Sequence, residues 1–183
     1  MFSHLNKSLL ILCIALLSFS ANAEPLSKEY QVKAAVLLKL TKFIAWHDDS
    51  LFNHDLSLPI NICLSQPEPF GFYIDSLAEE QNLGSNKHPM KIMRVSSKDE
   101  LSVCHVLFVP KGADLLAHEH PNKILFITDE DSITDTHFHI SIYTQNSKIK
   151  FAVNIDNVRQ DKIKLKSQLL HIAKIVKNSR DTH

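Results

Sequence analysis

Between residues 27 and 46, apolar side chains recur every three or four positions, which predicts one amphipathic helix. Ser27 is a suitable N-cap, and we expect the helix to run to about Trp46. A helical wheel places Lys33 on the apolar side. Such a lysine either extends its ammonium group past the core edge or meets a buried carboxylate, and we expect the first. The apolar side consists of Val32, Val36, Leu40 and Phe43.

Short apolar runs then alternate with helical patterns up to residue 127. Three helical segments are expected: one around Phe70–Ala78, a single turn opened by the capping box Ser97–Glu100, and one from Ala113 to about Glu119. This alternation predicts a largely parallel sheet with helices on both faces. The strands are expected at Leu58–Leu64, Met90–Val95, Val106–Val109 and Ile124–Ile127.

After residue 138 the pattern changes to a hairpin and a final helix. His139–Thr144 and Ile149–Ile155 alternate apolar and polar residues and are separated by residues 145–148. Ser167 is expected to cap a last helix with an apolar stripe that extends to Val176. The predicted fold class is therefore α/β with three layers: a mixed, mostly parallel sheet flanked by helices, followed by a C-terminal antiparallel hairpin and helix.

Residues 1–23 have the pattern of a secretory signal peptide. Lys7 precedes an apolar core, Leu9–Phe19, that is too short to span a bilayer, and Ala23 ends a small-x-small cleavage site. Leu12 is too large to precede a lipid-attachment cysteine at Cys13, so we expect no lipid anchor. We therefore expect cleavage after Ala23 and a single periplasmic domain over residues 24–183.

Composition excludes several functional classes. The mature chain has 19 basic and 20 acidic side chains, a balance that argues against nucleic-acid binding. Only three glycines occur, and none are close enough to form a phosphate-binding loop. No catalytic signature is present, so we expect no enzyme activity, no catalytic residues and no cofactor.

Charge is distributed unevenly along the chain. Residues 46–147 have six basic and fifteen acidic side chains, whereas residues 148–180 have nine basic and two acidic ones. Such a dipolar surface can orient a protein toward an acidic partner or toward anionic lipid headgroups. The alternative, which we expect, is the solvated face of a C-terminal helix.

Two cysteines, Cys63 and Cys104, remain after removal of the signal peptide. In an oxidising compartment two such thiols normally form one disulfide, and the alternative is a pair of buried small apolar residues. Cys63 lies late in one predicted strand and Cys104 just before another. Parallel neighbouring strands would place them at opposite ends, unless the predicted strand limits are wrong or the helical turn brings Cys104 across.

Histidines and acidic residues provide weak candidates for metal or proton chemistry. His137 and His139 are two residues apart, and on a strand they would share a face and could bind one metal ion. His118 and His120 are less suitable because they precede Pro121. We expect surface or capping roles for these histidines, and a solvated loop for the acidic run 129–131.

Several segments in this order resemble the YfiR family of periplasmic proteins from Gram-negative bacteria. No single segment is specific, but together they span nearly the whole mature chain. They are Glu29–Ala35, Lys42–Trp46, Ile60–Leu64 with Pro69–Gly71, Glu100–Val109, Ile149–Ile155, and Leu165–Leu170 with Ala173.

The resemblance implies an α/β fold and a homodimer. It further implies a repressor that binds the periplasmic domain of an inner-membrane diguanylate cyclase, with an outer-membrane OmpA-like lipoprotein that relieves the repression. Cys63 and Cys104 match the positions of a family disulfide. A second disulfide of some relatives would fall around residues 131–142, where this chain has no cysteine, and Thr136–His139 replaces a common glycine. Interface residues cannot be transferred.

The leading hypothesis is therefore a non-enzymatic regulator that lowers cyclic di-GMP output and biofilm formation. Two alternatives remain at this stage: a periplasmic small-ligand-binding module and a metal-handling protein.

Overall fold

The structure is a computed structural model that describes residues 26–45, 55–85, 87–113, 124–134 and 136–179. The predicted signal peptide lies outside these residues, as do His118, His120 and the predicted helix beyond Ala113. No helix of the described residues has the length and apolar character needed to cross a membrane.

A seven-stranded mixed sheet forms the centre of the domain, in the order β3-β2-β4-β5-β6-β7-β9. All neighbours are parallel except β6 and β7, which form the antiparallel hairpin. The predicted α/β class with a mixed, mostly parallel sheet is confirmed. The strands are β2 (Ile60–Ser65), β3 (Met90–Val95), β4 (Val106–Val109), β5 (Leu125–Thr128), β6 (Ile140–Gln145), β7 (Lys148–Asn154) and β9 (Lys174–Val176).

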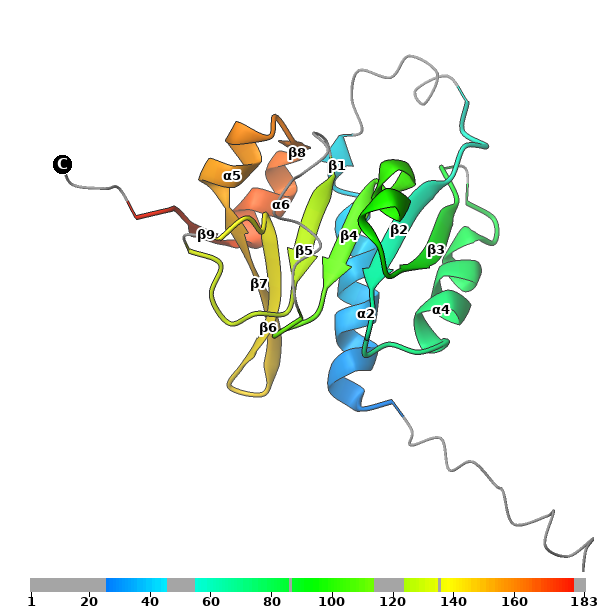
Figure 1. Cartoon of the computed structure of the whole chain (residues 1–183), viewed down its shortest axis with the longest axis horizontal. Helices are drawn as coiled ribbons and strands as arrows, with labels where there is room; N and C mark the ends of the chain where they lie inside the picture. Colours follow the sequence, from blue (N-terminus) through cyan, green and yellow to red (C-terminus); the bar gives the residue numbers. More distant parts are fainter. Residues whose placement is uncertain (1–25, 46–54, 86, 114–123, 135, 180–183) are drawn as a thin grey trace, which may run out of the picture.

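Helices α2 (Lys28–Thr41) and α4 (Tyr73–Asn82) pack on one face of this sheet (Figure 1). Phe70 and Phe108 meet in this core layer with ring centroids 4.8 Å apart. The same layer includes Val158 from α5 (Ile155–Gln160) and Leu169 from α6 (Ser167–Ile172). Among the described residues, the opposite face is covered by the 3₁₀ helix η1 (Lys98–Val103) and by residues 129–134 and 136–139.

Helix α2 differs from its prediction at its end and on its buried side. Ser27 is the N-cap as expected and accepts a hydrogen bond from the Tyr30 amide. The helix ends at Thr41 rather than Trp46, because the chain turns into the short strand β1 (Ile44–Ala45). The buried side is rotated relative to the predicted stripe, so that Val32 is 48% exposed while Lys33 is 4% exposed.

The C-terminal region corrects the prediction of one long final helix. Helix α5 begins where the hairpin strand was expected to end, and β8 (Lys164–Leu165) pairs with β1. Ser167 is the first residue of α6 rather than its cap, and the helix ends at Ile172. Val176 then lies in β9, beside Asn154 of β7. The hairpin turn itself is confirmed, with Asn146 and Ser147 both at positive φ.

Candidate functional site

Cys63 and Cys104 form a disulfide, with Cα atoms 5.8 Å apart. Cys63 lies opposite Leu107 in the register of β2 and β4, and Cys104 directly follows η1. Leu101 of η1 packs in the same core layer as both cysteines. Cys104 therefore approaches Cys63 from the face of the sheet rather than from a strand end, which removes the geometric conflict noted in the sequence.

Charged side chains gather where the parallel strands end, and the first group surrounds Arg94 at the end of β3. Its Nε donates to Glu68 over 3.0 Å, and its Nη atoms donate to Asp75 over 3.0 and 2.7 Å. The hydrogen bonds to Asp75 raise the pKa of Arg94 further above its usual value. This bidentate pair ties the loop after β2 to the first turn of α4 and to the end of β3.

The second group, which we call the Lys33–Asp129 cluster, joins α2 to the loops after β4 and β5. Its members are Glu29, Tyr30, Lys33, Lys111 and Asp129. Asp129 Oδ2 accepts hydrogen bonds from Tyr30 Oη over 3.1 Å and from Lys33 Nζ over 3.3 Å. Its Oδ1 accepts from the Lys111 amide over 2.6 Å, and Lys33 Nζ also lies 2.9 Å from Glu29 Oε1.

These contacts overturn two sequence expectations. The Lys33 ammonium does not extend past the core edge, because the side chain is 5% exposed and is paired with a carboxylate that is 2% exposed. The acidic run after β5 is not a solvated loop at Asp129. Glu130 also binds the chain, accepting the Gly112 amide over 2.9 Å, whereas Asp131 is exposed and pairs with Lys111.

The contacts of the Lys33–Asp129 cluster shift the pKa values of Tyr30, Glu29 and Lys111 from their usual values. Burial, reinforced by the nearby Asp129 carboxylate, raises the pKa of Tyr30 to about 12. Hydrogen bonds from Lys33 and Thr144 lower the pKa of Glu29. On the surface, the contact with Asp131 raises the pKa of Lys111 and lowers that of Asp131. Tyr30 is thus a neutral hydrogen-bond donor here.

In open α/β sheets, ligands commonly bind outside the carboxyl ends of the strands, where the strand order reverses. That point lies between β2 and β4 in this sheet. In the described part of this edge, the charged side chains of Arg94, Lys33 and Asp129 bind partners within the chain. These side chains therefore connect the loops and helices at this edge to one another through charge-assisted hydrogen bonds.

The structure does not bring His137 and His139 together as metal ligands. His137 is exposed in the loop before β6, and His139 is fully buried. Nδ1 of His139 accepts the Phe126 amide over 2.9 Å, so its other nitrogen, 3.0 Å from Asp161, carries the proton. Among the described residues, no group of three or more histidine, cysteine or acidic side chains is arranged to hold a metal ion.

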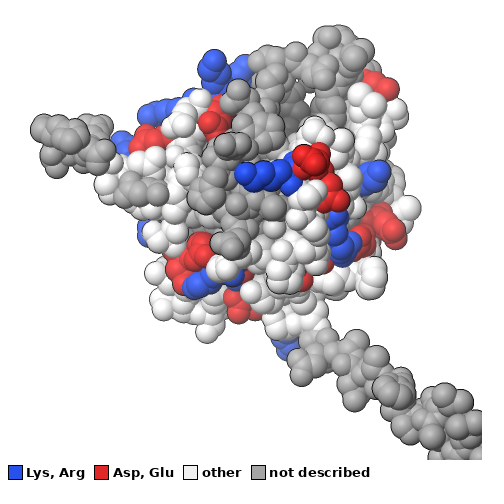
Figure 2. Space-filling model, viewed as in Figure 1, with Lys and Arg blue, Asp and Glu red and all other residues white. Residues whose placement is uncertain are grey.

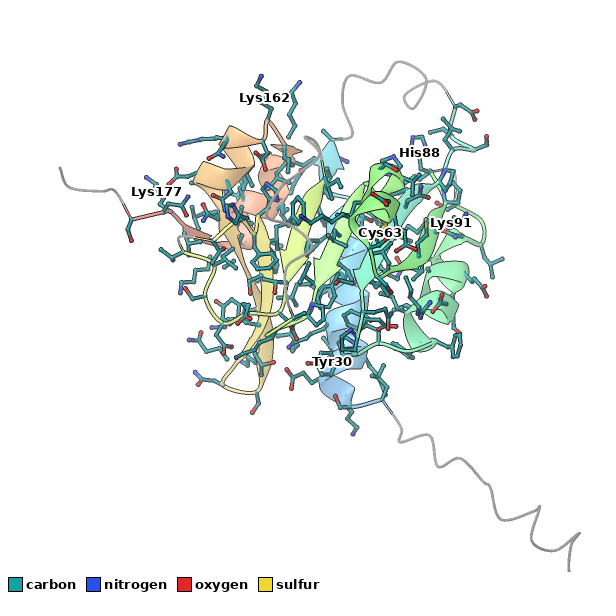
Figure 3. All side chains as sticks on the ribbon, viewed as in Figure 1. Tyr30, Cys63, His88, Lys91, Lys162 and Lys177 are labelled. Atoms are coloured by element: carbon teal, nitrogen blue, oxygen red, sulfur yellow. A yellow bond between two sulfur atoms is a disulfide. The ribbon has the colours of Figure 1, made fainter. Side chains whose placement is uncertain are left out.

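A cavity lies at the opposite, amino end of β2 and β3. It has a volume of about 350 Å³, within the usual range for small-ligand pockets. Gln81 of α4 contributes a buried side-chain oxygen, Oε1, that has no hydrogen-bond partner in the structure. Figure 3 shows His88 of this cavity and Tyr30 of the Lys33–Asp129 cluster at opposite ends of the sheet. The apolar lining includes Ile44, Ala45, Leu56, Ile60 and Met90, and the basic lining includes Lys42, Lys87, His88 and Lys166.

Sequence reasoning missed Tyr30, Lys111 and Gln81. The signal for the Lys33–Asp129 cluster was nevertheless present, because Lys33 was placed on the apolar side of its helix and Asp129 directly follows a buried strand. The signal for the cavity was absent, since its lining comes from segments far apart in the chain.

Comparison with known proteins identifies the family. No curated protein matches the chain. Among solved structures it is similar to the ABC domain in complex with L-Trp from Streptococcus pneumonia, with a TM-score of 0.45 and 11% sequence identity. That similarity covers 81% of this chain and 60% of that one.

A family model described as YfiR/HmsC-like matches residues 30–174. The matched segment runs from the first turn of α2 to the start of β9 and includes both bridged cysteines. The family comprises periplasmic regulators of cyclic di-GMP signalling, which agrees with the expected export of this chain. On this match the chain belongs to the YfiR/HmsC-like family.

Proposed function

We propose that this protein is a non-enzymatic repressor that binds the periplasmic domain of an inner-membrane diguanylate cyclase and thereby lowers cyclic di-GMP output. The observation that carries the proposal is the family match over residues 30–174. The cleavable signal peptide expected over residues 1–23 supports the same compartment, and the disulfide Cys63–Cys104 suits an oxidising one.

The carboxyl edge of the sheet adds support for a binding role. Enzymes of this architecture place reacting groups at that edge. Here the described charges of the edge are engaged with each other, as in the contacts of Lys33 and Arg94 with neighbouring carboxylates. Such internal contacts hold this surface in one conformation. A surface of this kind is suited to protein recognition, because the interface backbone of most pre-organised complexes moves little on binding.

The proposal includes two further associations that the family resemblance implies. The protein acts as a homodimer, and an outer-membrane OmpA-like lipoprotein relieves the repression by competing for it. The signal would then pass from the outer envelope to the inner membrane through release of this protein from the cyclase.

The test is chemical crosslinking of the tagged protein in living cells, followed by mass spectrometry of the products. We expect a membrane protein with a GGDEF-type output domain, together with a crosslinked dimer of this chain. The proposal is wrong if no cyclase is recovered while an unrelated envelope protein is recovered reproducibly.

The cavity favours a second candidate function, the binding of a small ligand. Its apolar walls, its basic rim of Lys42, Lys87 and Lys166, and the unpaired Gln81 oxygen suit an amphipathic anion that has one hydrogen-bond donor. We expect a thermal-shift screen to find saturable stabilisation by one such class of compound. The shift should disappear in Gln81→Leu and persist in Glu80→Leu, an exposed neighbour on the same helix.

A further inference from the structure

The C-terminal part of the chain presents a basic surface that the proposed function does not use. Residues 148–179 contain eight basic side chains and two acidic ones. Six of the basic side chains are exposed around α5, β8 and β9, and one of them, Lys166, is held by the Lys42 carbonyl. We call the other five the C-terminal basic surface: Arg159, Lys162, Lys164, Lys174 and Lys177.

The two acidic residues of this region are held by contacts within the chain. Asp161 accepts a hydrogen bond from buried His139, and Asp156 accepts the Asn178 amide over 3.0 Å. The lysines therefore determine the charge that faces outward. Figure 2 shows blue side chains along the upper left margin of the molecule, over α5 and β8.

Two large apolar side chains are exposed beside these lysines. Ile172, the last residue of α6, is 68% exposed, and Ile175 of β9 is 43% exposed. They lie between His171 and Lys177 in sequence, so apolar and basic groups alternate along this segment. Lysines combined with exposed aliphatic side chains are typical of surfaces that lie in a membrane interface.

We propose that the C-terminal basic surface, with Ile172 and Ile175, docks the protein on a bilayer that contains anionic phospholipid. Lysine is depleted at protein–protein interfaces, where aromatic residues and arginine are enriched. This surface has four lysines and one arginine. A flexible ammonium group matches a fluid headgroup layer better than it matches a fixed carboxylate geometry.

The charge distribution also determines which side of the protein faces the bilayer. Residues 46–147 have fifteen acidic and six basic side chains, so this part of the chain is repelled by an anionic surface. The basic end therefore faces the bilayer and the acidic part faces away. Docking in this orientation would confine the protein to a layer next to the membrane. This inference goes beyond the proposed function and does not depend on it.

The experiment is sedimentation of the protein, purified from the periplasm, with vesicles of phosphatidylethanolamine and phosphatidylglycerol. Vesicles of phosphatidylcholine alone serve as the uncharged control. We expect binding to the anionic vesicles only, and weaker binding at about 300 mM salt than at about 50 mM salt. Because the mature chain has a net charge near zero, from 19 basic and 20 acidic side chains, such binding requires a localised patch.

Matched variants assign the binding to this surface. Each lysine near an anionic bilayer contributes roughly fivefold to partitioning, so K162Q/K174Q/K177Q should weaken binding on the order of 100-fold. The control variant K28Q/K39Q/K91Q makes the same change in net charge at exposed positions elsewhere, and it should bind like the wild type. Figure 3 shows Lys91 on the opposite side of the molecule from Lys177. Ile172→Ser should weaken the binding that remains at high salt.

Three results would overturn the proposal: no binding of the wild type to anionic vesicles, equal binding by the C-terminal triple variant, or equal weakening by the control variant. The surface binds protein instead if the wild type does not sediment with vesicles but crosslinks to an acidic protein, and the C-terminal triple variant no longer forms that crosslink. Loss of vesicle binding with the cyclase crosslink retained would leave the proposed function intact.

Discussion

Replacing Lys33 with methionine removes the cation from the Lys33–Asp129 cluster while keeping a side chain of similar length. Lys33 and Asp129 side chains are only 5% and 2% exposed, so their charges cannot be screened by water. Removal of one partner from a buried ion pair costs about 3–5 kcal/mol, because the other charge stays buried. In K33M, Asp129 retains hydrogen bonds from Tyr30 and from the Lys111 amide. We therefore expect K33M to lower the free energy of unfolding by about 3 kcal/mol, the lower end of this range.

Urea unfolding, followed by circular dichroism at neutral pH, measures this cost. For a domain of this size, about 3 kcal/mol corresponds to a melting temperature lower by roughly 6–12 °C. The matched control is Lys39→Met, a change at an exposed position of the same helix that should stay within about 0.5 kcal/mol of wild type. Asp129→Asn should cost less than K33M, because Lys33 keeps its contact with Glu29.

The double variant K33M/D129N isolates the interaction between the two side chains. It should be less destabilised than the sum of the single variants by about 1–3 kcal/mol, because the second substitution removes the stranded charge. The reasoning fails if K33M unfolds like K39M, or if the two single effects simply add. The first outcome would mean that Lys33 reaches solvent, as the sequence alone led us to expect, and the second would mean that Lys33 and Asp129 do not interact.

Three other predictions follow from the described contacts. Replacing Cys63 and Cys104 together with alanine should lower the free energy of unfolding by roughly 4 kcal/mol, because the bridge closes a long loop with a sequence separation of 41. In urea denaturation, the reduced wild-type protein should have the same free energy of unfolding as this double variant. The raised pKa of Tyr30, about 12, means that the unfolded chain loses this proton first as pH rises above about 10. Stability should therefore fall between about pH 10 and about pH 12 in wild type, and less steeply in Y30F; equal slopes would contradict the burial of this phenol. His139→Leu should cost about 1–3 kcal/mol because the Phe126 amide loses its acceptor, whereas His171→Leu, at an exposed position, should be nearly neutral in the same denaturation assay.

Much of the central sheet could be predicted from the sequence because its strands are short apolar runs with distinct ends. Met90–Val95 and Val106–Val109 have the predicted bounds. The prediction of one long C-terminal helix was wrong for a physical reason. Ile172 and Val176 have helical spacing, but β7 offers an edge with which the chain forms β9, and this tertiary pairing outweighs the local pattern.

The candidate sites were less accessible to sequence reasoning. The Lys33–Asp129 cluster depends on a contact between residues 96 positions apart. The local patterns mark Lys33 and Asp129 separately, but they do not show that the two side chains meet. His139 illustrates the same limit. Its spacing from His137 suggested metal binding. In the structure the ring is buried, and its two nitrogens bind the Phe126 amide and the Asp161 carboxylate.

The central claim is that this protein represses a diguanylate cyclase from the periplasm, and the most direct measurement is the cellular concentration of cyclic di-GMP. Deletion of the gene should raise that concentration, and a second deletion, of the crosslinked cyclase, should return it to the starting value. Restoring the wild-type gene in the single deletion should do the same. An unchanged concentration in the single deletion, or an increase that persists without the cyclase, would contradict the account.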